Sequence, residues 1–189
     1  MAELEIRIFG DPVLRQKARR IDDFDGALAR LASDMHETMR AREGVGLAAN
    51  QVGVLKRLFT WEFTDEDDQR HGGAVANPVL VDSSETLEED DEGCLSFPGL
   101  FYPVARPLRV EVDYQDLSGD AHRAVVDGFA ARVWLHEMDH LDGVLFIDHL
   151  AAHDRRAAQD AMRAYRLDQG LDGERSGGPG GLLLGRRSP

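Results

Sequence analysis

Apolar residues recur with a helical period near the start of the chain. Leu28, Leu31, Ala32 and Met35 have i, i+3, i+4 and i+7 spacing, which places them on one face of an α-helix. Met39 continues this face, and a glycine at position 44 follows at the point where a helix would end. We therefore expect one amphipathic helix over about residues 26–42.

Four later segments have the pattern of strands. The segments 52–61 (VGVLKRLFTW) and 72–82 (GGAVANPVLVD) are rich in Val and Leu between Gly and Asp residues. In residues 108–116 (LRVEVDYQD), apolar and charged side chains alternate strictly, as in a half-buried strand. A DLSGD turn joins this run to residues 121–128, so the last two segments are expected to form a hairpin.

Two more helices are expected after the strands, over about residues 130–141 and 154–166. Val133, Met138 and Leu141 fall on one side of the first of these helices. Strands that lie between a few helices, without regular alternation, favour an α+β fold. We expect mostly antiparallel sheets around the 130–141 helix, with one helix near each end of the chain.

The composition favours one folded domain and a tail. Apolar residues make up 42% of the 189 residues and charged residues 30%, which is an ordinary globular balance. From about Asp168 onward the chain is Gly-rich with almost no periodicity. We therefore expect a catalytic domain over residues 1–167 and a disordered tail over residues 168–189.

Charge and targeting signals narrow the class of protein. The net charge of -13 argues against a binder of DNA or of anionic membranes, since phosphate contacts need clustered Lys and Arg. No signal peptide or apolar run of membrane-spanning length is visible, and the single cysteine fits a reducing compartment. A cytoplasmic protein is expected. The acidic run 85–93 lacks the ligand spacing of a calcium loop and is expected to be a solvated loop.

The segment WLHEMDHLDG contains the clearest chemical motif. His136 and His140 are four residues apart, so both imidazoles lie on one helix face and can reach one metal ion. Glu137, directly after the first histidine, is placed to take a proton from a metal-bound water. The alternative is a buried helix whose histidines are satisfied by hydrogen bonds. A catalytic site also needs a third protein ligand.

Two glycine-containing segments offer further groups. Cys94, in EGCLSFPG, is either a small buried hydrophobic residue or a thiolate that completes a Cys-His-His site with one open position. Gln51, in GVGLAANQVG, offers a neutral amide suited to an oxyanion, and the alternative is a surface glutamine in a tight turn. Neither nucleotide-binding glycine pattern is present in this segment.

These segments together resemble a known family. GVGLAANQ, EGCLS and HEMDHLDG, in this order, are similar to the three signature motifs of the peptide deformylases, and GDPVLR at residues 10–15 resembles the opening of that family. The resemblance covers about residues 5–160. It implies that Cys94, His136 and His140 hold one ion per chain, natively Fe(II), although Zn(II), Ni(II) or Co(II) would accept the same ligands.

The resemblance also implies roles in catalysis. Glu137 would act as the general base on a metal-bound water, and the substrate would be the N-formylmethionine of nascent peptides. The Gln51 amide and the backbone N–H of Leu95 would hold the tetrahedral oxyanion. Formate and a free N-terminal methionine would be the products.

Substrate contacts follow from the same resemblance. Val45 and Val133 would line the methionine pocket, and the backbone near Gly46 would pair with the peptide as an added strand. Gly46, Leu47 and Leu95 would crowd the site and exclude longer acyl groups. A Glu92–Arg106 ion pair would position the metal-binding segment, and a solvated Glu92 is the alternative. Arg132 departs from the apolar residue that is common in the family, so the pocket rim is expected to be more polar.

Two rival functions remain open from the sequence. A His-Glu-x-x-His zinc peptidase would take its third ligand downstream, from Asp148, His149 or His153. A non-catalytic binder of the ribosome or of nascent peptides is the other alternative. The last expected helix carries four arginines and favours ribosome contact as an added role. These are Arg155, Arg156, Arg163 and Arg166.

Overall fold

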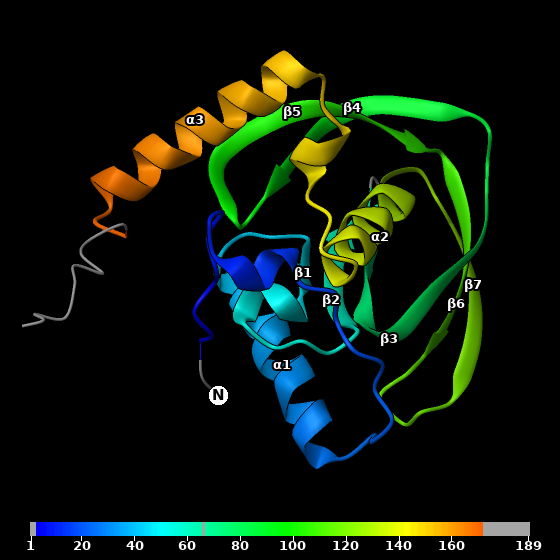
Figure 1. The fold of residues 1–189 in the computed structure, drawn as a ribbon. Coiled ribbons are helices and arrows are strands. Elements are labelled where there is room, and N and C mark those ends of the chain that lie inside the picture. The colour runs from blue at the N-terminus through cyan, green and yellow to red at the C-terminus, as the bar shows by residue number, and fades with distance from the viewer. Residues whose placement is uncertain (1–2, 66, 172–189) are drawn as a thin grey trace, which may run out of the picture.

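The computed structural model describes residues 3–65 and 67–171, and Figure 1 shows how the elements are arranged. The α-helices of this part of the chain are α1 (Gly26–Ala41), α2 (Gly128–Leu141) and α3 (Ala152–Asp168). The short 3-10 helices are η1 (Pro12–Arg15), η2 (Ala49–Val52) and η3 (Phe146–His149). The strands are β1 (Gly46–Ala48), β2 (Leu58–Thr64), β3 (Arg70–Ser83), β4 (Leu87–Cys94), β5 (Phe97–Pro107), β6 (Arg109–Gln115) and β7 (Ala121–Asp127).

The strands form two separate antiparallel sheets. A five-stranded sheet has the order β1-β2-β3-β6-β7, and β4 and β5 form a two-stranded sheet of their own. Figure 1 shows α2 at the centre, with strands of both sheets around it, α1 on the opposite side of β1 and β2, and α3 at the periphery. The α+β prediction, with antiparallel sheets around a central helix, is confirmed.

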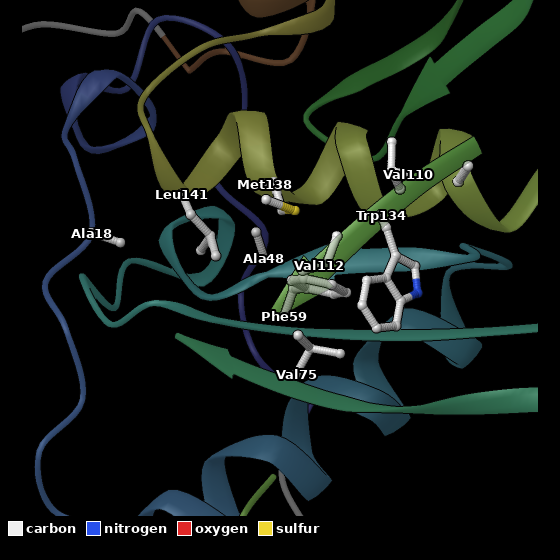
Figure 2. Close-up of a cluster of buried hydrophobic side chains, with 10 residues drawn as sticks. Ala18, Ala48, Phe59, Val75, Val110, Val112, Trp134, Met138 and Leu141 are labelled. Atoms are coloured by element: carbon white, nitrogen blue, oxygen red, sulfur yellow. The ribbon is translucent and has the colours of Figure 1, made fainter. Parts of the chain in front are cut away.

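The packing of α2 explains its central place. Its Ala131, Trp134, Met138 and Leu141 follow one another at intervals of three or four residues, so they lie on one face of the helix. All four are buried against the five-stranded sheet. Figure 2 shows this cluster, in which the rings of Trp134 and Phe59 meet edge to face with centroids 5.6 Å apart. The apolar face fixes the rotation of α2, so its polar face is directed away from this sheet.

Most of the expected elements are present. The helix expected over residues 26–42 is α1, whose first turn is capped by the Asp25 carboxylate. The expected hairpin is β6 and β7. The strand expected over 52–61 is wrong in its first half, because η2 and a turn at Gly53, with φ 81°, come before β2. Local Val and Leu content does not distinguish such a turn from a strand.

The acidic run is the main correction. Residues 85–93 were expected to be a loop, but most of them lie in β4, which pairs with β5 along its length. The acidic side chains of β4 are mostly exposed, as expected, while the backbone is a strand. The sequence did not predict β5, because Pro98, Pro103 and Pro107 argue against a strand.

The remaining boundaries differ little. The motif helix begins two residues earlier than expected, at Gly128, and the last helix extends to Asp168. The expected tail starts at this residue, and its residues 172–189 lie outside the described part of the chain. Within the described residues, no helix is both long and apolar enough to cross a membrane.

Asn77 fastens the N-terminal segment to the sheet. Its side chain is buried, accepts a hydrogen bond from the Ile21 N–H at 2.8 Å, and donates to the carbonyl oxygen of Ile21 and to Oε1 of Gln115, both at 2.8 Å. Its φ of 51° is in the left-handed region, which Asn tolerates better than most residues.

We expect Asn77→Ala to lower the free energy of unfolding by about 2–4 kcal/mol, because two buried hydrogen bonds and one partly buried hydrogen bond are lost. Urea unfolding followed by circular dichroism measures this change. The control is Asp82→Ala, an exposed position on the same strand, which should change the free energy by less than about 0.5 kcal/mol. Equal effects of the two substitutions would show that the Asn77 contacts add nothing to stability.

Candidate metal centre

Cys94, His136 and His140 come together from two different elements. Cys94 is the last residue of β4, where the pairing with β5 shifts register after Gly93, and the histidines are one turn apart on α2. Their ligand atoms all lie within 4.8 Å of one another, and Cys94 Sγ is 3.2 Å from His140 Nε2. Both histidines are buried. The structure therefore brings together the three residues that the sequence suggested as ligands.

The donor set fits a divalent transition-metal ion. Two ligand atoms on one tetrahedral ion, with bonds of roughly 2.0–2.3 Å, are about 3–4 Å apart, and the three donors are already near this spacing. Burial lowers the pKa of His136, but the Cys94 side chain and Glu92 outweigh burial and raise this pKa well above its usual value. Burial and the positive charge of His136 lower the pKa of His140.

Glu137 lies beside the three ligands with a free oxygen. Its side chain is 3% exposed, and its Oε2 has no hydrogen-bond partner among the described residues. Burial raises the pKa of Glu137 to about 7, and the positive charge of His136 only partly offsets burial. A carboxylate in this setting is suited to proton transfer.

Gln51 has a fixed orientation next to Cys94. Its Oε1 accepts a hydrogen bond from the Ala48 N–H at 2.7 Å, so its Nε2 points toward Ser96 Oγ, at 3.2 Å, and Cys94 Sγ, at 3.5 Å. Gln51 is 1% exposed, which excludes the surface glutamine that was the alternative. Its amide is therefore a directed donor beside the candidate ligands.

A cavity of about 760 Å³ opens onto these groups. The expected substrate residues Val45, Gly46, Val133 and Leu95 line it, together with Cys94, His136, Glu137 and Gln51. Leu47 differs from expectation, because its side chain is fully buried in the core against α1 and does not line the cavity. It alternates with Gly46 along β1, so it faces the opposite side of the strand.

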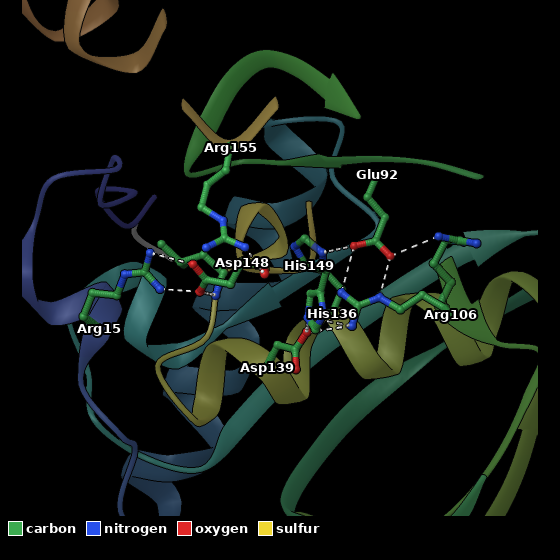
Figure 3. A network of polar contacts seen from close by, with 10 residues as sticks. Arg15, Glu92, Arg106, His136, Asp139, Asp148, His149 and Arg155 are labelled. Atoms are coloured by element: carbon green, nitrogen blue, oxygen red, sulfur yellow. Dashed lines mark hydrogen bonds and ion pairs between the residues drawn. The ribbon is translucent and has the colours of Figure 1, made fainter. Parts of the chain in front are cut away.

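Glu92 is the centre of a buried ion-pair network, which Figure 3 shows in part. Arg106 binds both of its carboxylate oxygens, at 2.7 and 3.0 Å, and His136 Nδ1 lies 3.0 Å from Oε2. Burial alone would raise the pKa of Glu92, but the hydrogen bonds from Arg106 and His136 outweigh it and lower the pKa to about 2. Glu92 is 4% exposed, so it is not a solvated charge. Because Glu92 accepts a hydrogen bond from Nδ1 of His136, the other ring nitrogen, Nε2, is free to bind an ion.

Three residues that the sequence did not suggest belong to the surroundings of the site. Ser96 is fully buried against Gln51, and Asn50 is fully buried with its Nδ2 donating to the carbonyl oxygen of His140. Asp139 accepts from Arg106 Nη1 at 2.7 Å and therefore extends the network of Glu92. All three residues lie within the quoted motifs, but the sequence alone assigned no role to them.

Arg132 lines the cavity, but it does not offer a free polar group there. Its side chain is buried, and its guanidinium is directed to the β4–β5 sheet and to Glu92.

The ligands that a peptidase would need are used elsewhere. Asp148 pairs with Arg15, His149 Nε2 lies 2.7 Å from Asp139, and His153 Nε2 lies 3.1 Å from Asp154. Among the described residues, Cys94, His136 and His140 form the group of potential ligands that lies closely enough for one ion. The geometry therefore does not support a downstream third ligand.

Known proteins match nearly the whole described chain. The family model "Polypeptide deformylase" matches residues 3–156. A peptide deformylase of Thermus thermophilus is 47% identical, with 84% of this chain and 88% of the relative covered. One from Parafrankia is 45% identical and covers 86% and 87% of the two chains.

Solved structures agree with this match. The crystal structure of a plant peptide deformylase has a TM-score of 0.84 at 34% identity, over 92% of this chain and 94% of the other. A structure from Synechococcus elongatus in complex with actinonin has a TM-score of 0.78 at 40% identity, over 86% and 87%. The chain thus belongs to the peptide deformylases, a family of metal-dependent hydrolases that remove the N-formyl group from the N-terminal methionine of newly made polypeptides.

Proposed function

We propose that the deformylation takes place at the centre formed by Cys94, His136 and His140, with Glu137 as general base. The observation that carries this assignment is the buried Oε2 of Glu137, which has no hydrogen-bond partner among the described residues. Glu137 lines one cavity together with Cys94 and His136, and His140 completes the group of potential ligands behind them. Water attacks the formyl carbon, the C–N bond breaks, and formate and a free amine leave. Glu137 accepts the proton of the attacking water and passes it to the leaving nitrogen.

The ion that we propose is Fe(II), as the family resemblance implies, with Zn(II), Ni(II) or Co(II) accepted by the same donors. When bound, it supplies Lewis acidity, which lowers the pKa of water and polarises the formyl oxygen. A thiolate and two imidazoles would leave one position open for substrate or water. Elemental analysis of protein purified without oxygen identifies the ion, and anaerobic preparation should be needed to retain iron.

Gln51 and the Leu95 N–H would hold the oxyanion. The Gln51 Nε2 is directed by the hydrogen bond at its Oε1, so this donor is oriented before substrate arrives. Preorganised donors stabilise charge that develops in the transition state, because they need no rearrangement during the reaction.

We expect Gln51→Ala to lower kcat by roughly 10²-fold with a smaller change in KM, because this donor acts mainly on the transition state. Steady-state kinetics with formyl-Met-Ala-Ser give both constants. A loss confined to KM would instead assign Gln51 to substrate binding.

The cavity would bind the methionine and restrict the acyl group. Val45 and Val133 offer apolar walls, and the bare backbone at Gly46 allows an extended peptide to approach β1. The Leu95 side chain, which lines the cavity and lies close to Gly44, would restrict a longer acyl group. Formate release from formyl-Met-Ala-Ser, compared with acetate release from acetyl-Met-Ala-Ser, tests the function and its specificity. Turnover of neither peptide by the iron-loaded protein would overturn the proposed function.

Contact with the ribosome through α3 is a separate proposal. Two of the four arginines are used within the chain, because Arg155 donates to three backbone carbonyl groups and Arg166 donates to the Phe9 carbonyl. Arg156 is exposed, and Arg163 is exposed with Asp160 as its partner. Removal of α3 would uncover core, since Ala158 and Met162 are buried. Charge reversal of Arg156 and Arg163 is therefore the better test. It should weaken cosedimentation with ribosomes and spare turnover of short peptides, and unchanged cosedimentation would contradict the proposal.

A further inference from the structure

Arg132 makes an unusual number of contacts for one side chain. It lies on α2 and is 5% exposed. Its Nη1 donates to the carbonyl oxygens of Val104 at 2.8 Å and Asp90 at 3.3 Å and to Oε1 of Glu92 at 3.1 Å. Its Nη2 donates to the carbonyl oxygen of Glu88 at 2.8 Å. One guanidinium therefore joins α2 to β4, which carries Glu88, Asp90 and Glu92, and to β5, which carries Val104.

These contacts bridge the two elements that supply the candidate ligands. Arg132 is one helical turn before His136, and Glu92 is two residues before Cys94 in β4. The two elements belong to different parts of the fold, since the β4–β5 sheet shares no strand pairing with the five-stranded sheet. The separation between Cys94 and the histidines is therefore set by how the β4–β5 sheet docks on α2.

We propose that Arg132 is a positioning residue, which fixes Cys94 at the distance from His136 and His140 that one ion requires. This inference rests on the proposed function of the three ligands. Arg132 acts through β4 and Glu92 and does not itself touch the ligand atoms. Arg106 makes the complementary connection, because it binds Glu92 within the β4–β5 sheet and Asp139 on α2.

The chemistry of the guanidinium suits this task. Its planar fork has donors in two directions, so it reaches a carboxylate and carbonyl groups of both strands at once. A lysine has one nitrogen on a flexible stem, so it cannot donate at the same time to the acceptors that the two terminal nitrogens of Arg132 bind. A methionine fills a similar space without any donor, and it leaves the carbonyls of Glu88 and Val104 without this partner.

A second role for Arg132 is distinguishable from positioning. Arg132 also lines the cavity, so a substitution could alter the wall of the methionine pocket. A wall effect would change KM for the peptide and leave the metal untouched. A positioning effect would change how firmly the ion is held in the absence of any peptide. Metal release is thus the decisive readout.

The experiment uses the full chain loaded with Co(II), in the wild-type, Arg132→Met and Arg132→Lys forms. Arg123→Met is the matched control, because Arg123 is an arginine with ion-pair partners on the sheet surface, far from the cavity lining. The release of Co(II) to excess chelator is followed through the thiolate-to-cobalt absorption band. Circular dichroism checks folding, and formate release gives kcat and KM.

We expect Co(II) release to be about 10- to 100-fold faster in Arg132→Met, with an altered cobalt spectrum, and intermediate in Arg132→Lys. Arg123→Met should match the wild type. Should Arg132→Met fail to fold, the rate and the spectrum of Arg132→Lys decide. Wild-type release rates and spectra in the folded Arg132 variants, with a change only in KM or only in thermal stability, would overturn the positioning role. Absence of formate release by the wild type would instead count against the proposed function.

Discussion

The Glu137→Gln variant should lose deformylase activity by roughly 10³-fold or more while it retains its metal. The amide has the shape of the carboxylate but cannot accept the proton of the attacking water, and general-base catalysis contributes about 10²–10⁴-fold to enzymatic rates. Because Glu137 is not among the three candidate ligands, the metal content should stay at the wild-type level. Formate release under anaerobic conditions, with elemental analysis of the same sample, measures both quantities.

A matched control distinguishes the loss of the general base from a general effect of removing one negative charge. Glu89→Gln removes one exposed carboxylate from β4 outside the cavity and should leave kcat unchanged. If Glu137→Gln kept more than about a tenth of wild-type kcat, another group would have to move the proton.

Gly46→Ala should have the second largest effect, a loss of about 10³-fold in kcat/KM. A Cβ at residue 46 would overlap Oε1, Cδ and Cγ of Glu137, so the carboxylate must move. Displacement of a catalytic group by about 1 Å can cost 10²-fold, and the new methyl group would also obstruct the β1 edge where the peptide is expected to lie. Steady-state kinetics measure the loss, and metal analysis should show an unchanged content.

Gly73→Ala is a fitting control for this substitution. Gly46 pairs with Trp61 in the sheet, and Trp61 pairs with Gly73 on its other side. A Cβ at residue 73 would meet only Trp61 Nε1, at 3.9 Å, which is ordinary contact. Full activity of Gly46→Ala would mean that Glu137 has another productive position.

The metal ligands could be suggested from the sequence because half of the geometry is local. The spacing of His136 and His140 places both on one face of any helix, and this relation does not depend on the rest of the fold. For Cys94 the residues alone left two alternatives, a buried hydrophobic residue or a ligand, and only the family resemblance favoured the ligand, since its approach to α2 depends on the docking of β4. The helix itself therefore brings His136 and His140 together, whereas packing between distant segments brings Cys94 to them.

The surroundings of the ligands were less accessible to sequence reasoning. Arg132 appeared to be a polar residue at a pocket rim, because nothing in the sequence shows that its acceptors are carbonyl groups of β4 and β5. Leu47 appeared to contact substrate, although strand alternation directs it to the core. The acidic run had the composition of a loop, and only its pairing with β5 makes it a strand. The errors on Arg132 and on the acidic run concern contacts between residues distant in the sequence, whereas the direction of Leu47 follows from the local alternation of β1.

The division of the ligands between a separate two-stranded sheet and α2 has a consequence for folding kinetics. Cys94 lies more than 40 residues before His136 and His140 in sequence, so the ion-binding cluster cannot form until the chain between Cys94 and α2 has closed a long loop. Metal capture should therefore be among the last events of refolding, and its rate should follow the docking of the β4–β5 sheet on α2. In a cell, a newly made chain would therefore bind its metal only after the β4–β5 sheet has docked on α2, and its first turnover would follow that step.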